Sequence, residues 1–163
     1  MMGSGKTTVG RELARRTGWP FLDNDTLVRE LTGREPRAID SEDGEDALHA
    51  AEIAAFRAAS ERPGPAIIAV AGAVVDDDAA LARLATAGHV VWLRGRPETL
   101  HGRIGTGDGR RADARDLDWI RARASERGPR YEAAADQIVD IENHRPGAIA
   151  REILAALGDP SAG

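Results

Sequence analysis

The stretch Gly3-Ser4-Gly5-Lys6-Thr7-Thr8 decides the fold of this chain. It matches the second half of the phosphate-binding pattern G-x-x-x-x-G-K-[ST], whose glycines let backbone N–H groups turn towards a phosphate. The lysine adds a positive charge that reaches the outer phosphates, and the hydroxyl of Thr7 is an oxygen ligand suited to Mg²⁺. The motif therefore predicts a loop that binds nucleotide phosphates at the start of a helix.

The alternative is a glycine-rich turn that merely precedes a helix. Lys6 is the only lysine in the chain, since every other strongly basic residue is arginine. A helix over Thr8–Thr17, with an apolar stripe and with Gly18 in the position of a C-terminal cap, supplies the context that the motif requires. These two observations favour nucleotide binding over the simple turn.

The pattern is incomplete at its start, because its opening glycine would fall immediately before Met1. In phosphate-loop folds the strand that precedes the loop is central in a parallel sheet. We therefore expect the natural protein to begin upstream, and a sheet built without that strand to have a gap between its neighbours.

Composition limits the function further. The chain has 163 residues, enough for one domain with a substantial core, and its formal net charge is −5. That charge argues against a nucleic-acid or anionic-membrane surface, and no apolar run approaches the roughly 20 residues of a membrane span. Without cysteine there is no disulfide framework and no thiol nucleophile. We expect a cytoplasmic monomer that binds neither nucleic acid nor membrane.

Apolar runs alternate with helical stripes, which predicts an α/β fold with a parallel sheet. Residues 1–157 form a single domain in this interpretation, with a glycine- and arginine-rich lid at about 105–116 and a flexible tail at 158–163. The expected strands are Phe21–Leu22, Ala66–Val70, Val90–Leu93 and Gln137–Asp140. The expected helices after the first are Thr26–Leu31, Asp46–Ser60, Ala79–Thr86, Pro97–Gly102, Leu117–Ala135 and Pro146–Leu157.

Asp23 and Asp25 follow the first expected strand and, two residues apart in extended chain, point the same way. Ligands of open α/β sheets bind at the carboxyl ends of the strands. Asp23 is therefore a candidate to support Mg²⁺, and Asp25 to orient or deprotonate an acceptor hydroxyl. The alternative for Asp25 is a helix cap, and both roles are compatible.

Asp76-Asp77-Asp78 resembles a metal cluster, but acidic residues before a helix are explained by a solvated cap. The four histidines show no ligand spacing, so we do not expect a zinc site.

With the loop and these carboxylates in place, the chain resembles the shikimate kinase family over nearly its whole length. The likeness rests on the phosphate loop and on further short motifs in the same order. These are Phe21-Leu22-Asp23-Asn24-Asp25, Thr32-Gly33-Arg34, Asp43-Gly44-Glu45 with Glu52, the lid, Pro129 with Tyr131, and Arg145-Pro146-Gly147. The resemblance implies a P-loop kinase fold with a parallel sheet of about five strands, and phosphoryl transfer from MgATP to a hydroxyl.

The resemblance also implies roles for individual residues. Lys6, Asp25 and Arg110 would be catalytic: Lys6 on the β/γ-phosphates, Asp25 as base on the acceptor hydroxyl, and Arg110 on the transferring phosphoryl group. Thr7 and Asp23 would hold the metal. The ATP-binding set would be Gly3, Ser4, Gly5, Lys6, Thr7, Thr8, Arg103, Arg110, Arg145 and Pro146, with Arg103 and the Arg145-Pro146 turn flanking the adenine.

The acceptor side departs from the family pattern. The family holds the carboxylate of shikimate with two arginines, and we align those positions with His49 and Glu132; its triple-glycine turn is Val70-Ala71-Gly72 here. The expected acceptor site is thus Asp25, His49, Gly72 and Glu132. A neutral histidine forms no bidentate fork with a carboxylate and a glutamate repels one. Arg130 or Arg57 could substitute, although neither matches a family position.

The favoured interpretation is a MgATP-dependent kinase whose acceptor is shikimate or a neutral cyclitol, sugar or related polyol. Genuine shikimate kinase activity with a rearranged carboxylate site is the second interpretation. The third is a nucleotide-binding protein of the same fold with a decayed acceptor site, against which the retained Asp25 and Arg110 count. A nucleoside monophosphate kinase is less favoured, because nothing directs Arg29, Arg34 and Arg37 towards the site.

Overall fold

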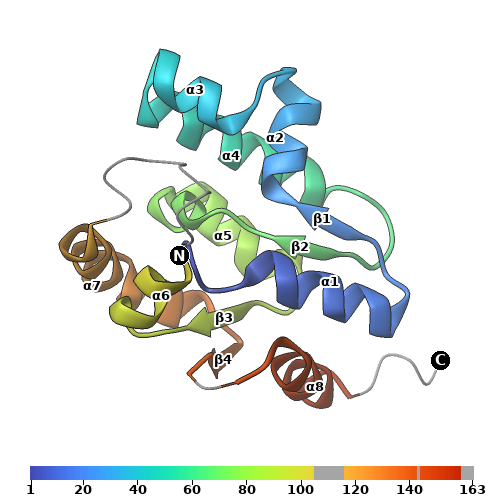
Figure 1. The fold of residues 1–163 in the computed structure, drawn as a ribbon. Coiled ribbons are helices and arrows are strands. Elements are labelled where there is room, and N and C mark those ends of the chain that lie inside the picture. The colour runs from blue at the N-terminus through green and yellow to red at the C-terminus, as the bar shows by residue number, and fades with distance from the viewer. Residues whose placement is uncertain (105–115, 143, 159–163) are drawn as a thin grey trace.

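The computed structural model describes residues 1–104, 116–142 and 144–158. Helices surround four short strands in the described residues (Figure 1). The strands are β1 (Phe21–Asp23), β2 (Ile67–Ala69), β3 (Val91–Arg94) and β4 (Gln137–Asp140). The helices are α1 (Lys6–Thr17), α2 (Asn24–Thr32), α3 (Pro36–Asp43), α4 (Glu45–Ser60), the 3₁₀ helix η1 (Gly72–Asp76), α5 (Asp78–Ala87), α6 (Pro97–Arg103), α7 (Leu117–Ala134) and α8 (Pro146–Ala156).

The expected strands and helices all form, with ends that differ by up to two residues. α1 begins at Lys6 rather than at Thr8. Its N-cap is Gly5, whose left-handed conformation lets the chain turn directly into the helix. Two elements were not expected, α3 and η1. α3 begins with a proline in its first turn, but only Ile39 of its residues is buried, so the sequence carries no apolar stripe.

The strands form two separate parallel pairs instead of one sheet. β1 pairs with β2 in the register Phe21–Ile67 to Asp23–Ala69, and β3 pairs with β4 from Val91–Gln137 to Arg94–Asp140. Four of the about five expected strands lie within the described residues, where they form two pairs of two.

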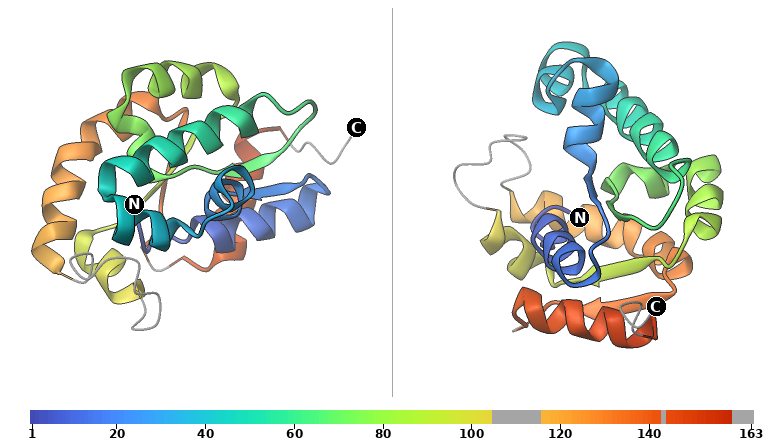
Figure 2. Two further views of the ribbon diagram at one scale, coloured as in Figure 1. Left: turned by 90° about the horizontal axis from the view of Figure 1, so that it is seen from above. Right: turned by 90° about the vertical axis from the view of Figure 1, so that its right-hand side faces the viewer.

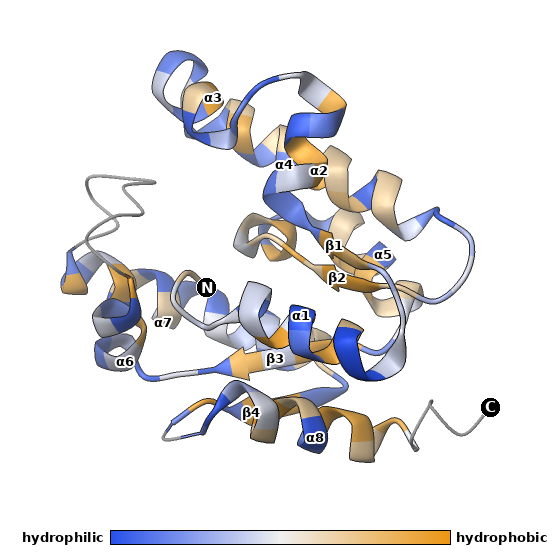
Figure 3. Cartoon of the chain, turned by 45° about the vertical axis from the view of Figure 1, so that its right-hand side comes forward, coloured by the Kyte–Doolittle hydropathy of each residue, from blue (hydrophilic) through white to orange (hydrophobic). Residues whose placement is uncertain are grey.

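An apolar slot of about 510 Å³ lies between the two pairs, where the expected gap should be. β2 and β3 line it from opposite sides, together with Val9 and Leu13 of α1. Figures 2 and 3 show α1 beside these two strands, whose apolar residues appear in orange in Figure 3.

The core is divided in the same way as the strands. One buried cluster combines α1, β3, β4, α6, α7 and α8, and includes Val139 and Ile141, both with no exposed surface. A second cluster joins α2, α3 and α4, and a third joins α4, η1 and α5 around Phe56. The functional cavity described below lies at the boundary between these units.

Replacing Ile141 by alanine tests the first cluster. The side chain is fully buried, so its loss removes apolar contacts and leaves a cavity, and we expect unfolding to become easier by about 2–5 kcal/mol. Denaturant unfolding followed by circular dichroism measures the change. Leu157, which is 37% exposed, is the control: its alanine variant should change stability much less. Equal effects at both positions would contradict this assignment of the core.

Candidate active site

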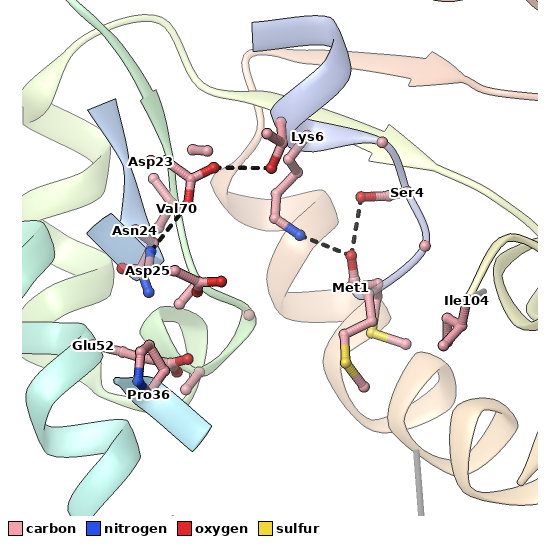
Figure 4. Close-up of a pocket in the computed structure, with 18 of the residues that line it drawn as sticks. Met1, Ser4, Lys6, Asp23, Asn24, Asp25, Pro36, Glu52, Val70 and Ile104 are labelled. Carbon is pink, nitrogen blue, oxygen red and sulfur yellow. Dashed lines mark hydrogen bonds between the residues drawn. The ribbon is translucent and has the colours of Figure 1, made fainter. Parts of the chain in front are cut away.

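A cavity of about 830 Å³ lies at the carboxyl ends of β1 and β2, facing the start of α1. The phosphate loop forms one wall, and the turn after β2 with α2, α3 and α4 forms another (Figure 4). Residues of α6, α7 and α8 close the remaining side. The size and position suit a nucleotide together with a small second substrate.

The phosphate loop has the backbone that its sequence predicts. Gly3 and Gly5 have φ values of 72° and 87°, a region that residues with a Cβ rarely adopt. A Cβ on Gly3 would also lie 2.3 Å from the carbonyl oxygen of Leu100. The N-terminal N–H groups of α1 therefore face the cavity at the end of a loop that tolerates no side chain at Gly3.

Lys6 and Ser4 both donate to the carbonyl oxygen of Met1, at 2.8 Å and 3.0 Å (Figure 4). These contacts fold the loop back over the start of α1. The Lys6 ammonium therefore stands at this wall of the cavity, which favours an anionic ligand.

Asp23 connects the loop with the opposite wall. Its Oδ2 accepts a hydrogen bond from Thr7 Oγ1 at 2.9 Å, and its Oδ1 accepts one from the Asp25 N–H at 3.1 Å. Asp23, not Asp25, is therefore the N-cap of α2. Asp25 stands in the first turn and lines the cavity, so the helix-cap alternative for Asp25 is wrong.

The Thr7–Asp23 pair fits Mg²⁺. A hydroxyl and a carboxylate oxygen lie side by side next to the phosphate loop, and Mg²⁺ prefers few protein oxygens alongside substrate phosphates and water. When bound, the ion would neutralise charge on the phosphates. Among the described residues no group of three or more acidic, histidine or cysteine side chains forms a metal cluster.

The acceptor wall carries Asp25, His49, Glu52 and Gly72, which all line the cavity. Figure 4 shows Asp25 and Glu52 across the cavity from Lys6. Asp25 therefore lies where a base could meet a hydroxyl held in front of the phosphate loop. Val70 and Ala71 also line this wall, so the turn is bulkier than a triple glycine.

Arg127 of α7 is a cavity residue that sequence reasoning missed. Its side chain is only 8% exposed, and its Nε and Nη2 donate to the two carboxylate oxygens of Asp76 at 3.2 Å and 2.5 Å. The remaining nitrogen, Nη1, faces Gly72, since a Cβ there would lie 3.2 Å from it. Asp76 thus fixes a buried guanidinium whose third nitrogen faces the acceptor wall.

Glu132 lies outside this site, and its predicted part in acceptor binding is wrong. The residue is exposed and does not line the cavity, whereas Arg127 and Tyr131 do face the acceptor wall. Arg127 and Tyr131 are four residues apart and share a face of α7, while Glu132 is rotated away from it. The helical spacing from Tyr131 back to Arg127 was the signal that could have identified the arginine.

Tyr131 supports the same wall. Its hydroxyl donates to the carbonyl oxygen of Gly72 at 3.3 Å, and burial raises its pKa to about 12. The phenol therefore stays protonated at neutral pH and keeps this hydrogen bond. Gly72 is consequently held between Tyr131 and Arg127.

The aspartate triplet is more than a solvated cap. Asp77 does cap α5, accepting from the Ala80 N–H at 2.6 Å, as the sequence indicated. Each aspartate, however, also contacts an arginine, and the pairs are Asp76–Arg127, Asp77–Arg57 and Asp78–Arg130. Arg57 and Arg130 are thus engaged at η1 and the start of α5, and neither lines the cavity.

The other end of the cavity contains part of the expected adenine site. Arg103 and Pro146 line it beside Ile104 and Trp119, and Arg103 Nη2 donates to the Ile141 carbonyl at 3.0 Å. Arg145 is exposed and does not line the cavity, although its neighbours His144 and Pro146 do, so its expected place beside the adenine stays a prediction. Arg110 and residues 105–115 of the lid lie outside the described residues.

Comparison with known proteins identifies the same family as the sequence motifs do. The family model described as shikimate kinase matches residues 2–158. The chain belongs to the shikimate kinase family. A shikimate kinase of Moorella thermoacetica is 42% identical over 158 residues, covering 96% of this chain and 90% of that protein. One of Mycobacterium tuberculosis is 34% identical over 163 residues, covering 98% and 90%.

Solved structures of the family have the same fold. Shikimate kinase from Acinetobacter baumannii in complex with shikimate has a TM-score of 0.89 at 25% identity, covering 99% of this chain and 91% of that one. The enzyme from Aquifex aeolicus has a TM-score of 0.80 at 29% identity, covering 100% and 96%. The expected α/β kinase fold and a phosphotransferase activity with an alcohol acceptor are confirmed, and nothing favours a decayed, non-catalytic relative.

Partner and location are less fully determined. No described helix is long and apolar enough to cross a membrane. The family supports a small-molecule acceptor and ATP as the donor. The monomeric state, the absence of nucleic-acid binding and the cytoplasmic location stay predictions.

Replacing Gly3 by alanine tests the phosphate loop. The new Cβ would meet the Leu100 carbonyl and the backbone would be strained, so we expect MgADP affinity to fall at least about tenfold by calorimetric titration. Gly18→Ala is the control, because Gly18 has nearly the same φ of 74° but open space around it and lies away from the cavity. It should lose some stability and keep its nucleotide affinity; a Gly3 variant that binds MgADP normally would contradict the assigned loop.

Proposed function

We propose that this protein transfers the γ-phosphate of MgATP to a hydroxyl of shikimate. The observation that carries the proposal is the presence of Lys6, Asp25 and Arg127 around one cavity. Lys6 suits a phosphate, Asp25 suits the proton of a hydroxyl, and Arg127 suits a carboxylate. Shikimate carries both a hydroxyl and a carboxylate.

The phosphate end depends on the loop and on α1. Backbone N–H groups at the start of α1 and the Lys6 ammonium would hold the β- and γ-phosphates. Thr7 and Asp23 would hold Mg²⁺ beside them, as their 2.9 Å contact supports. This arrangement leaves the γ-phosphate facing the acceptor wall.

The reaction is an in-line displacement. The acceptor oxygen forms a bond to the γ-phosphorus while the bond from that phosphorus to the β,γ-bridging oxygen breaks, releasing ADP. Asp25 accepts the proton of the attacking hydroxyl, which it can do from its position across the cavity from Lys6. In this proposal Arg110 stabilises the charge on the transferred phosphoryl group.

Arg127 changes the interpretation of the acceptor. With Glu132 outside the cavity, the repulsion that argued against a carboxylate is gone, and a buried arginine faces Gly72 instead. Asp76 fixes two nitrogens of that arginine, so Nη1 is oriented before the acceptor arrives. A carboxylate-bearing acceptor is therefore favoured over a neutral polyol, with His49 as the second contact.

Replacing Asp25 by asparagine separates binding from chemistry. The amide keeps the shape and cannot accept the proton, so we expect kcat to fall by about 10²–10⁴-fold with MgADP affinity unchanged. Coupled ADP release, with MgATP and with or without shikimate, measures this. Glu30→Gln, an exposed change on the same helix, should leave kcat intact. Near-full activity of the Asp25 variant would show that the base is elsewhere.

Replacing Arg127 by lysine tests the carboxylate contact. Lysine keeps the charge but cannot contact Asp76 and the acceptor at the same time in the arginine geometry. We expect KM for shikimate to rise about tenfold to a hundredfold while kcat changes less. Arg130→Lys, which loses contacts with exposed Asp78 and with the Val75 carbonyl outside the cavity, should leave KM unchanged. An unaltered KM in the Arg127 variant would exclude a carboxylate at this point.

A further inference from the structure

His49 is aligned with an arginine of the family, and its contacts in the structure show how it can act differently from that arginine. Its side chain lines the cavity and is 22% exposed. Its Nε2 lies 3.3 Å from Glu45 Oε1, one turn earlier on α4. Arg123 of α7 lies 3.3 Å from the same oxygen and also contacts Glu126. One carboxylate oxygen of Glu45 therefore contacts both His49 and Arg123.

The Glu45 contact determines what the ring can offer a ligand. A carboxylate beside Nε2 keeps a proton on that nitrogen, so a neutral His49 has an unprotonated Nδ1, which accepts hydrogen bonds but cannot donate them. The imidazolium form donates from both nitrogens. Nδ1 is thus suited to a hydroxyl donor when the ring is neutral and to a carboxylate when it is charged.

We propose that His49 is a proton-dependent specificity residue of the acceptor site. Its imidazolium form binds the carboxylate of the acceptor together with Arg127, and its neutral form does not. The inference rests on the proposed acceptor, and goes beyond it by making acceptor affinity depend on one proton. A site with two arginines would lack this dependence, because arginine stays charged throughout.

The charges around His49 favour its protonation. Glu45 is in direct contact, and Arg123 is already engaged with Glu45 and Glu126, as Arg127 is with Asp76. The other titratable groups that line the same cavity are Lys6, Asp23, Asp25, Glu35, Arg37, Asp40, Glu52, Arg103 and His144. Glu45 contacts the ring directly, and a carboxylate at contact distance favours the imidazolium because Coulomb energy falls with distance.

The direction in which acceptor affinity changes with pH follows from the imidazolium form of His49, which is the form that binds the carboxylate. An ordinary histidine has a pKa of about 6.5, while a carboxylic acid such as shikimate is ionised above a pH of about 5. A bound anion favours the imidazolium, so acceptor binding takes up a proton near neutral pH. Affinity is greatest at pH values below the pKa of free His49 and is lost as pH rises through the pKa of His49 in the complex.

The test is calorimetric titration of the protein in MgADP with shikimate, between about pH 5.5 and 8.5, on either side of the ordinary histidine value. Two buffers of different ionisation enthalpy at each pH report the protons taken up. We expect affinity to fall about tenfold to a hundredfold over this range, the value of one charge-assisted hydrogen bond, with proton uptake around the midpoint. The methyl ester of shikimate, which lacks the charge, should show neither effect.

Three variants isolate the residue. His49→Arg should bind shikimate with the same affinity at every pH and without proton uptake. Glu45→Gln should keep the dependence but move its midpoint to lower pH, because the imidazolium loses its carboxylate partner. His89→Gln, at a histidine that contacts Gln137 outside the cavity, should behave as the unaltered protein. MgADP affinity verifies that each variant is folded.

The outcomes separate this inference from the proposed function. Shikimate binding that is independent of pH, or a pH dependence that survives in His49→Arg, would overturn the role of His49 even if shikimate were phosphorylated. Proton-linked binding without ADP release would support His49 and overturn the phosphotransfer. If shikimate did not bind at any pH, both the proposed acceptor and this inference would fail.

Discussion

The carboxylate of Asp23 is the constraint on which the rest of the site depends. One oxygen accepts from the hydroxyl of Thr7 and the other from the backbone N–H of Asp25. A single side chain thereby fixes the start of α1, the end of β1 and the start of α2 relative to one another. The donor half and the acceptor half of the cavity belong to different packing units, and this contact joins them beside the phosphate loop.

Much of this arrangement could be predicted from the sequence because it is local. The phosphate loop and the helix after it depend on residues within one turn of each other, and the glycine at each special φ is visible in the sequence. α3 was missed because only Ile39 of that helix is buried, and η1 because a 3₁₀ turn has no periodic pattern. The gap between the two strand pairs was expected from the phosphate-loop motif, whereas the register within each pair depends on contacts between distant segments, which no local pattern contains.

The acceptor wall was the least predictable part, and the reason is geometric. Adjacent residues of a helix point about 100° apart. Assigning the family's arginine to the wrong position of α7 therefore selects a side chain that faces the solvent instead of one that faces the cavity. Glu132 and Arg127 demonstrate this, since one is exposed and the other is buried against Asp76. The role of the aspartate triplet was also hidden, because its arginine partners lie roughly 20 residues before and 50 residues after it.

The division of the strands into two pairs has a consequence for cooperativity. The β1–β2 pair packs with α2, and the β3–β4 pair packs with α8, while α1 contacts elements of both. Opening of one half need not require opening of the other, so the two halves can exchange amide hydrogens at different rates. A nucleotide that contacts Lys6 on one side and an acceptor held by Asp25 on the other would bridge them. Substrate would then add to the contacts that already join the two halves, such as Arg127–Asp76, and would stabilise both of them.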